Sequence, residues 1–201
     1  MMRKRYVGGL LMVLLSPAAI AQPALIDSMT LQPTSQLWVE GTSTVRGFKC
    51  TATEVNATVE STSAQAATAV LAGQKAVGKV EFTVPAARLD CANGTMNEHM
   101  LKALKAKEHP RIEFRLSSYD LVPAGDGAVT VKLNGRLNLG GVEKPVVMQA
   151  KATAGANGTL LVSGSQEVKL SDHGLKAPSL MMGTMKVGDV VKVRYELVLQ
   201  S

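Results

Sequence analysis

Apolar and polar residues alternate along most of this chain, in one run after another. A period of two residues is typical of a β-strand that buries one face and exposes the other. Because each run has one apolar and one polar face, the runs predict an antiparallel sheet rather than a sheet buried between helices. The clearest runs are residues 54–60, 79–84, 111–116, 129–139 and 191–200.

Residues 95–108 depart from this alternation and predict one helix. Thr95 and Glu98 match a capping box, in which a threonine begins the helix and a glutamate follows three residues later. Apolar side chains then recur every four residues and share one helical face: Met96, Met100 and Leu104. Pro110 is expected to stop the helix. A second helical or irregular stretch is expected over residues 177–185.

The number and length of the alternating runs predict a closed sheet. Turn sequences separate the runs, including Gly140-Gly141 and Asn157-Gly158. We expect about eight long strands, and closure into a barrel would remove both the exposed apolar face and the sheet edges. The inward positions are mostly Val, Leu, Ala and Gly, and small inward residues leave volume. An all-β antiparallel barrel with one capping α-helix and an internal cavity is therefore predicted.

The first 21 residues have the pattern of a signal peptide. A basic start (residues 3–5) precedes an apolar run (residues 7–15) that is too short to span a bilayer. Ala19-Ile20-Ala21 follows as a small-x-small cleavage pattern, so cleavage is expected between Ala21 and Gln22. An N-terminal anchor helix is the alternative. The mature protein is expected to be periplasmic or secreted.

Composition narrows the possible partners. The chain has 201 residues, of which 46% are hydrophobic, 19% charged and 3% aromatic, which suits one folded domain and excludes a disordered chain. Only one long uncharged apolar stretch exists, so no transmembrane span is expected in the mature chain. Loss of residues 1–21 lowers the formal net charge from +6 to +3, because three basic residues leave with it. With so few aromatic residues, nucleic-acid binding is not expected.

Cys50 and Cys91 are the only cysteines, and an even number in an exported chain predicts a disulfide. It would close a loop of about 40 residues and contribute roughly 4 kcal/mol on the chain-entropy model. A pair of metal-binding or redox thiols is the alternative, although CxxC spacing is absent.

Four blocks of the sequence resemble the YceI-like family of exported bacterial proteins. They are the opening segment at residues 38–48, the block at residues 96–114, the hairpin at residues 135–146 and the closing segments at residues 172–175 and 185–191. The similarity spans most of the mature chain. We therefore divide the sequence into a cleaved signal peptide (1–21), an N-terminal lead-in (22–36) and a YceI-like barrel domain (37–199).

This resemblance implies a lipocalin-like barrel with an elongated apolar cavity. It implies binding of a polyisoprenoid or isoprenoid quinone, with no enzymatic activity and no cofactor. The hypothesis is that the lipid tail threads the barrel, that its polar head stays near the mouth, and that the helix from Thr95 gates the mouth. The candidate ligand-binding residues are Phe48, Phe82, Met96, Met100, Leu104, Phe114, Met148, Val193 and Tyr195.

Two other functions stay open. Met181, Met182 and Met185, with His173 nearby in sequence, resemble the thioether clusters that select Cu(I), which suggests a periplasmic copper protein. A structural barrel that acts through a protein partner is the other. The oligomeric state, monomer or homodimer, stays open as well. An enzyme is the weakest interpretation, because no GxSxG or HExxH motif is present and the histidines are far apart in sequence.

Overall fold

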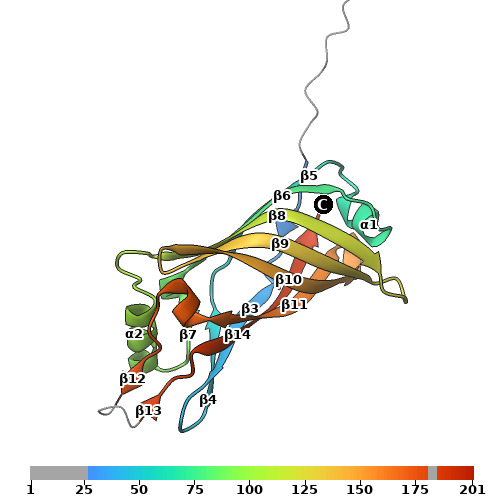
Figure 1. The fold of residues 1–201 in the computed structure, drawn as a ribbon. Coiled ribbons are helices and arrows are strands. Elements are labelled where there is room, and N and C mark those ends of the chain that lie inside the picture. Colours follow the sequence, from blue (N-terminus) through green and yellow to red (C-terminus); the bar gives the residue numbers. More distant parts are fainter. Residues whose placement is uncertain (1–26, 181–184) are drawn as a thin grey trace, which may run out of the picture.

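A computed structural model describes residues 27–180 and 185–201 of the chain. Within these ranges twelve strands hydrogen-bond into one strongly curled antiparallel sheet, and two short strands form a separate pair (Figure 1). The elements in chain order are β1 (Asp27–Ser28), β2 (Thr30–Leu31), β3 (Gln36–Thr42), β4 (Gly47–Ala52), β5 (Asn56–Ser61), α1 (Ala66–Leu71), β6 (Val77–Pro85), β7 (Leu89–Asp90), α2 (Gly94–Ala103), β8 (Arg111–Pro123), β9 (Val129–Leu139), β10 (Val142–Ala154), β11 (Leu160–Lys169), β12 (Ser179–Leu180), β13 (Met185–Lys186) and β14 (Val190–Gln200).

The strand order confirms the predicted antiparallel, lipocalin-like barrel. Neighbouring strands follow the order β1-β5-β6-β8-β9-β10-β11-β14-β3-β4-β7, and β2 pairs with β14. The predicted closure of the sheet was wrong, because the described residues show no pairing between the two ends of this order. The sheet curls around its interior but keeps a seam. The lead-in also takes part in the sheet, since β1 pairs with β5 and β2 with β14.

All five alternating runs form strands, except that residues 54 and 55 precede β5, and the turns between the strands set the register. Leu139 pairs with Val142 across a two-residue turn, in which Gly140 and Gly141 have φ angles of 59° and 82°. Positive φ at both central residues suits the right-handed twist of a hairpin, and glycine adopts it without strain. The register of β8 against β9 shifts once, between Leu116 and Ser118. Such an irregularity increases local twist and helps the sheet to curl.

The predicted helix is present as α2, but its start differs from the prediction. Asn93 is the N-cap, and its side chain accepts a hydrogen bond from the Met96 amide at 2.9 Å. Thr95 lies inside the first turn and does not cap the helix. Asparagine caps helices as well as threonine does. Because Asn93 lies two residues before Thr95, the helix gains two residues, Gly94 and Thr95.

The helix also ends earlier than Pro110. Lys105 has a φ of 53°, and the Ala106 amide donates to the Leu101 carbonyl at 2.9 Å. These two features form a Schellman ending, which satisfies the last carbonyl groups. The prediction of a helix reaching Glu108 was therefore wrong, because a left-handed residue ends it first.

Residues 177–185 were expected to be helical or irregular. Instead β12 pairs with β13, with Ser179 opposite Lys186 and Leu180 opposite Met185. Residues 181–184 lie outside the described ranges. The sequence analysis also missed α1, whose Ala66, Ala67 and Val70 are buried.

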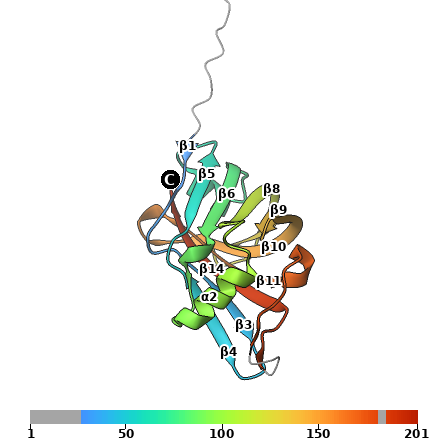
Figure 2. The same cartoon turned by 90° about the vertical axis from the view of Figure 1, so that its left-hand side faces the viewer.

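The two helices lie at opposite ends of the curled sheet (Figure 1), and α2 lies in front of the barrel interior when viewed from its own end (Figure 2). The buried apolar residues form one cluster with α1 and another beside α2. The α1 cluster includes Met29, Val70 and Tyr195, and the α2 cluster includes Leu104 and Leu139. The interior therefore has a core at each end rather than one continuous core.

Candidate functional site

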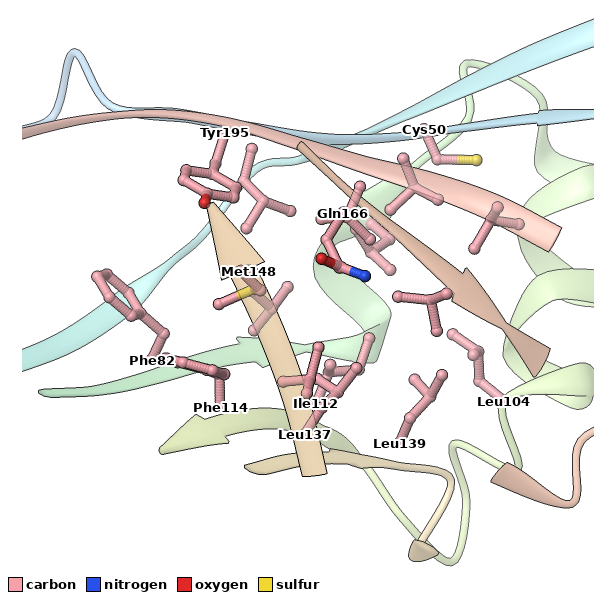
Figure 3. Close-up of a pocket in the computed structure, with 18 of the residues that line it drawn as sticks. Cys50, Phe82, Leu104, Ile112, Phe114, Leu137, Leu139, Met148, Gln166 and Tyr195 are labelled. Atoms are coloured by element: carbon pink, nitrogen blue, oxygen red, sulfur yellow. The ribbon is translucent and has the colours of Figure 1, made fainter. Parts of the chain in front are cut away.

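A cavity of about 610 Å³ runs through the interior of the curled sheet. Its walls are almost entirely aliphatic and aromatic, and residues from both core clusters contribute to them. Phe82, Phe114 and Met148 face this space (Figure 3), yet each keeps part of its surface accessible. Inward residues that stay accessible show that the barrel is hollow at this level. The volume lies in the usual range for small-molecule sites.

The cavity opens at the α2 end. The exposed residues among its lining are Val45 and Arg46, in the turn between β3 and β4, and Asn93 and Thr95, at the start of α2. Val45 is 67% exposed, although it is apolar. At the other end, the cavity-lining residue Val70 belongs to α1 and is buried. The cavity thus has a mouth between the β3–β4 turn and α2, and α1 covers its far end.

The structure brings all of the predicted ligand-binding residues to this one cavity. They line it from seven places: Phe48 on β4, Phe82 on β6, Met96 and Met100 on α2, Leu104 directly after α2, Phe114 on β8, Met148 on β10, and Val193 and Tyr195 on β14. Their contact with a ligand stays a prediction. His99 on α2 also lies on the cavity wall, near the mouth.

Three inward glycines are covered by aromatic rings. A Cβ atom on Gly41 would stand 2.3 Å from Phe48 Cζ, and one on Gly135 would stand 2.4 Å from Phe114 Cε2. A Cβ atom on Gly164 would stand 2.4 Å from the Tyr195 hydroxyl oxygen. The missing side chains let the rings lie against the wall of the barrel. The glycines therefore preserve the cavity indirectly, by making room for aromatic rings along the wall.

Away from the mouth, three polar side chains interrupt the apolar wall: Tyr119 on β8, Gln166 on β11 and Tyr195 on β14. Figure 3 shows Gln166 and Tyr195. Tyr195 is 8% exposed, and its hydroxyl has no hydrogen-bond partner among the described residues. Burial raises the pKa of Tyr195 to about 12. Sequence reasoning missed Gln166, although it is the one polar side chain on the inward face of an otherwise apolar run, Leu160, Val162, Gly164 and Val168.

A disulfide between Cys50 and Cys91 attaches the start of α2 to β4, as predicted. Asn97, which sequence reasoning missed, adds hydrogen bonds at the same place. Its Oδ1 accepts from the Cys91 amide at 2.8 Å, and its Nδ2 donates to Asp90 Oδ1 at 2.9 Å. The hydrogen bonds from Asn97 and from the Ala92 amide lower the pKa of Asp90. The first turns of α2 are therefore attached firmly beside the mouth.

The residues of the copper hypothesis are only partly described. Met181 and Met182 lie outside the described ranges, and Met185 begins β13. His173 is buried, and its Nδ1 lies 2.9 Å from the Val142 carbonyl oxygen. Within residues 27–180 and 185–201, no group of three His, Cys, Asp or Glu residues is placed to hold a metal ion. In the same ranges no helix has the length and hydropathy that crossing a membrane requires.

A curled antiparallel sheet around an apolar cavity with a mouth at one end defines the class of lipocalin-like barrel binding proteins. The chain belongs to the YceI-like family within this class, because the profile of the YceI-like domain matches residues 32–199. No curated protein among those compared with the sequence matches it.

Solved structures share the fold at low sequence identity. Burkholderia cenocepacia BcnA is 21% identical, with a TM-score of 0.61 over 82% of this chain and 95% of that chain. A polyisoprenoid-binding domain from Saccharophagus degradans, implicated in plant cell wall breakdown, is 11% identical, with a TM-score of 0.59 over 87% of this chain and 97% of that chain. The Campylobacter jejuni YceI protein is 20% identical, with a TM-score of 0.54 over 72% and 80%. At these sequence identities, the similarities show a shared fold.

Proposed function

We propose that this protein is an exported carrier that sequesters a long-chain amphiphile of the polyisoprenoid or isoprenoid quinone type. The observation that carries the proposal is the apolar cavity with its single described mouth. A hydrocarbon chain has few polar groups, so its affinity comes from apolar surface removed from water, at about 25 cal/mol per Å² before ordering costs. The solved relative described as a polyisoprenoid-binding domain supports this class of ligand.

The wall of the cavity suits the binding of a chain-like ligand more than the catalysis of a reaction. Arg46, at the mouth, is the only lining residue with a formal charge among those described. Acid–base or nucleophilic catalysis needs titratable side chains held against the reacting atoms, and the deep part of the described cavity wall offers only the Tyr119 and Tyr195 phenols and the Gln166 amide. We therefore propose binding without catalysis, and no resident cofactor.

Native mass spectrometry of the protein purified from its own host tests the carrier function. An adduct that fragments as an isoprenoid chain is expected. A copper-sized adduct that a chelator removes would contradict the proposal in favour of the methionine cluster. A bare protein that also refuses added polyisoprenoid and quinone would contradict it in favour of a structural barrel.

Two neighbouring residues of β10 offer a matched pair of variants. Met148 lines the cavity, whereas Val147 is 56% exposed on the outer face. Met148→Trp puts an indole into the cavity and is expected to displace the lipid. Val147→Trp adds the same indole outside and is expected to leave lipid binding unchanged. Equal retention of lipid by the two folded variants would exclude the cavity as the binding site.

Export is also a proposal, because it rests on the sequence pattern of residues 1–21, which lie outside the described ranges. N-terminal sequencing of protein from the periplasm or the culture medium is expected to begin at Gln22. Retention of residues 1–21 in the recovered protein would instead support an N-terminal anchor.

A further inference from the structure

Gln166 places a side-chain amide on the inward face of β11, in an otherwise apolar part of the cavity wall. Figure 3 shows this amide extending from the strand into the cavity, and the side chain is partly accessible. The next residue, Glu167, is exposed on the outer face of the sheet. Because Gln166 faces the opposite way, its accessible surface lies in the cavity, where a ligand can reach it.

The amide of Gln166 has hydrogen-bonding capacity to spare. Its Nε2 donates one hydrogen bond, to the Glu167 carbonyl oxygen at 2.9 Å. A glutamine has a second N–H and an acceptor oxygen as well, and neither has a partner in the described part of the chain. The other two polar side chains of the deep wall, Tyr119 and Tyr195, are buried. Among the described residues, Gln166 is therefore the polar group of this wall that a ligand can contact.

Gln166 lies in the half of the cavity that α2 covers. It pairs with Val193 of β14, Val193 pairs with Val39 of β3, and Val39 pairs with Cys50 of β4. The disulfide attaches Cys50 to the segment that leads into α2. A ligand with its polar group at Gln166 can therefore extend an apolar chain toward the α1 end, along the remaining length of the cavity.

An accessible amide in an apolar wall makes binding selective. Water can solvate the amide in an empty cavity, whereas a pure hydrocarbon would displace that water and leave the amide unpaired, which is unfavourable. A ligand hydroxyl or carbonyl would replace the lost hydrogen bond. A phosphate would find no balancing charge at Gln166, because Arg46 is the only described lining residue with a formal charge and it is exposed at the mouth.

We propose that Gln166 forms a hydrogen bond with an uncharged oxygen of the ligand, and that this bond selects neutral long-chain amphiphiles over hydrocarbons and over phosphorylated chains. The oxygen belongs to a hydroxyl, which donates to Oε1, or to a carbonyl, which accepts from the second N–H of Nε2. This inference rests on the proposed function and names the chemistry of its ligand.

Three probes with the same branched chain test the proposal: phytane, its alcohol phytanol and phytanyl phosphate. Their dissociation constants are measured by displacement of the fluorescent probe N-phenyl-1-naphthylamine. Gln166→Met keeps the unbranched shape of the side chain and removes the amide. Gln149→Met makes the same change at an exposed position of β10 and is the matched control.

The measured quantity is the ratio of the phytane dissociation constant to the phytanol dissociation constant. We expect Gln166→Met to lower this ratio about three- to tenfold, the net contribution of one hydrogen bond, and Gln149→Met to leave it unchanged. Gln166→Leu, a second apolar replacement, should give the same decrease. The wild type should bind phytanol more tightly than phytanyl phosphate. Continued binding of phytane by the variants shows that their cavity is intact.

Each other outcome counts against the inference. If both Gln166 variants bind phytane and keep the wild-type ratio, the amide does not bind the ligand. If the ratio falls as much in Gln149→Met, the effect does not come from the cavity wall. If phytanyl phosphate binds most tightly to the wild type and to Gln166→Met alike, the polar group lies elsewhere, and the carrier function stands without this inference. If no probe binds the wild type, the carrier function itself fails, and the inference fails with it.

Discussion

Phe114 lies over Gly135, so closely that a Cβ atom on the glycine would stand 2.4 Å from the ring and 2.7 Å from the Arg115 carbonyl oxygen. An added methyl group would therefore overlap both neighbours. One of them is a backbone atom, which cannot rotate away as a side chain can. Gly135→Ala is therefore expected to lower the free energy of unfolding by about 1–3 kcal/mol through overpacking. Denaturant titration would measure the loss.

Gly94 provides the control for that substitution. It lies in the first turn of α2, and a Cβ atom there would meet nothing within 4 Å. Gly94→Ala should be neutral or stabilise the protein by up to about 1 kcal/mol, because alanine restricts the unfolded chain. Equal losses of unfolding free energy in the two variants would show that the contact with Phe114 does not cause the loss.

The disulfide between Cys50 and Cys91 should stabilise the α2 end more than the α1 end. Reduction is expected to lower the free energy of unfolding by about 2–4 kcal/mol. Amide hydrogen exchange should then accelerate in α2, which the disulfide attaches to β4, while α1 stays protected. A uniform acceleration across both helices would instead mean that the disulfide only constrains the unfolded chain.

Met100 should control retention of the ligand. It lines the cavity from α2, so Met100→Glu places a charge against the apolar wall and should reduce lipid retention at least tenfold, because an unpaired buried charge is unfavourable by several kcal/mol. Lys102→Glu, on the exposed side of the same helix, is the control with the same new residue. Native mass spectrometry measures retained lipid, and circular dichroism checks the fold. A folded Met100→Glu protein that keeps its lipid would exclude a role for this face of α2.

Tyr195 should make the protein sensitive to alkali. Its folded-state pKa of about 12 lies above the ordinary value of 10.0, so the folded state holds the proton that the unfolded chain loses first. The contribution of this proton to the free energy of unfolding is complete below pH 10. It decreases by roughly 2–3 kcal/mol as the pH rises to about 12. Unfolding titrations of wild type and Tyr195→Phe across this range should diverge. Parallel pH dependences would show that Tyr195 ionises normally.

The sheet could be predicted from the sequence because the patterns that specify it lie within single strands and turns. The alternation at residues 129–139 depends on which side chains face the interior, and a shift of one residue would turn every one of them outward. The Gly140-Gly141 turn likewise fixes its hairpin without help from the rest of the chain. The predicted cavity residues within these runs followed from the same alternation, since inward positions of a curled sheet face one common interior, whereas those of α2 followed from helical spacing.

The missed features depend on contacts between distant segments. The segment of α1 has no clear apolar period, and its burial comes from packing against the barrel end. Asn97 acquires its role from its hydrogen bonds to Asp90 and Cys91. The unpaired state of the Tyr195 hydroxyl is visible only when all its neighbours are in place. The inward glycines were expected to leave empty volume, whereas aromatic rings from other positions cover them.

The cover that α1 forms at the far end of the cavity makes the interior a tube with one described opening. A chain-like guest in such a tube must reverse along the path by which it came, so the part that goes in first comes out last. Exchange then proceeds in single file: an occupied barrel cannot accept a second chain until the first has withdrawn past Val45 and Thr95. Any donor or recipient of the guest must therefore meet the protein at that one face.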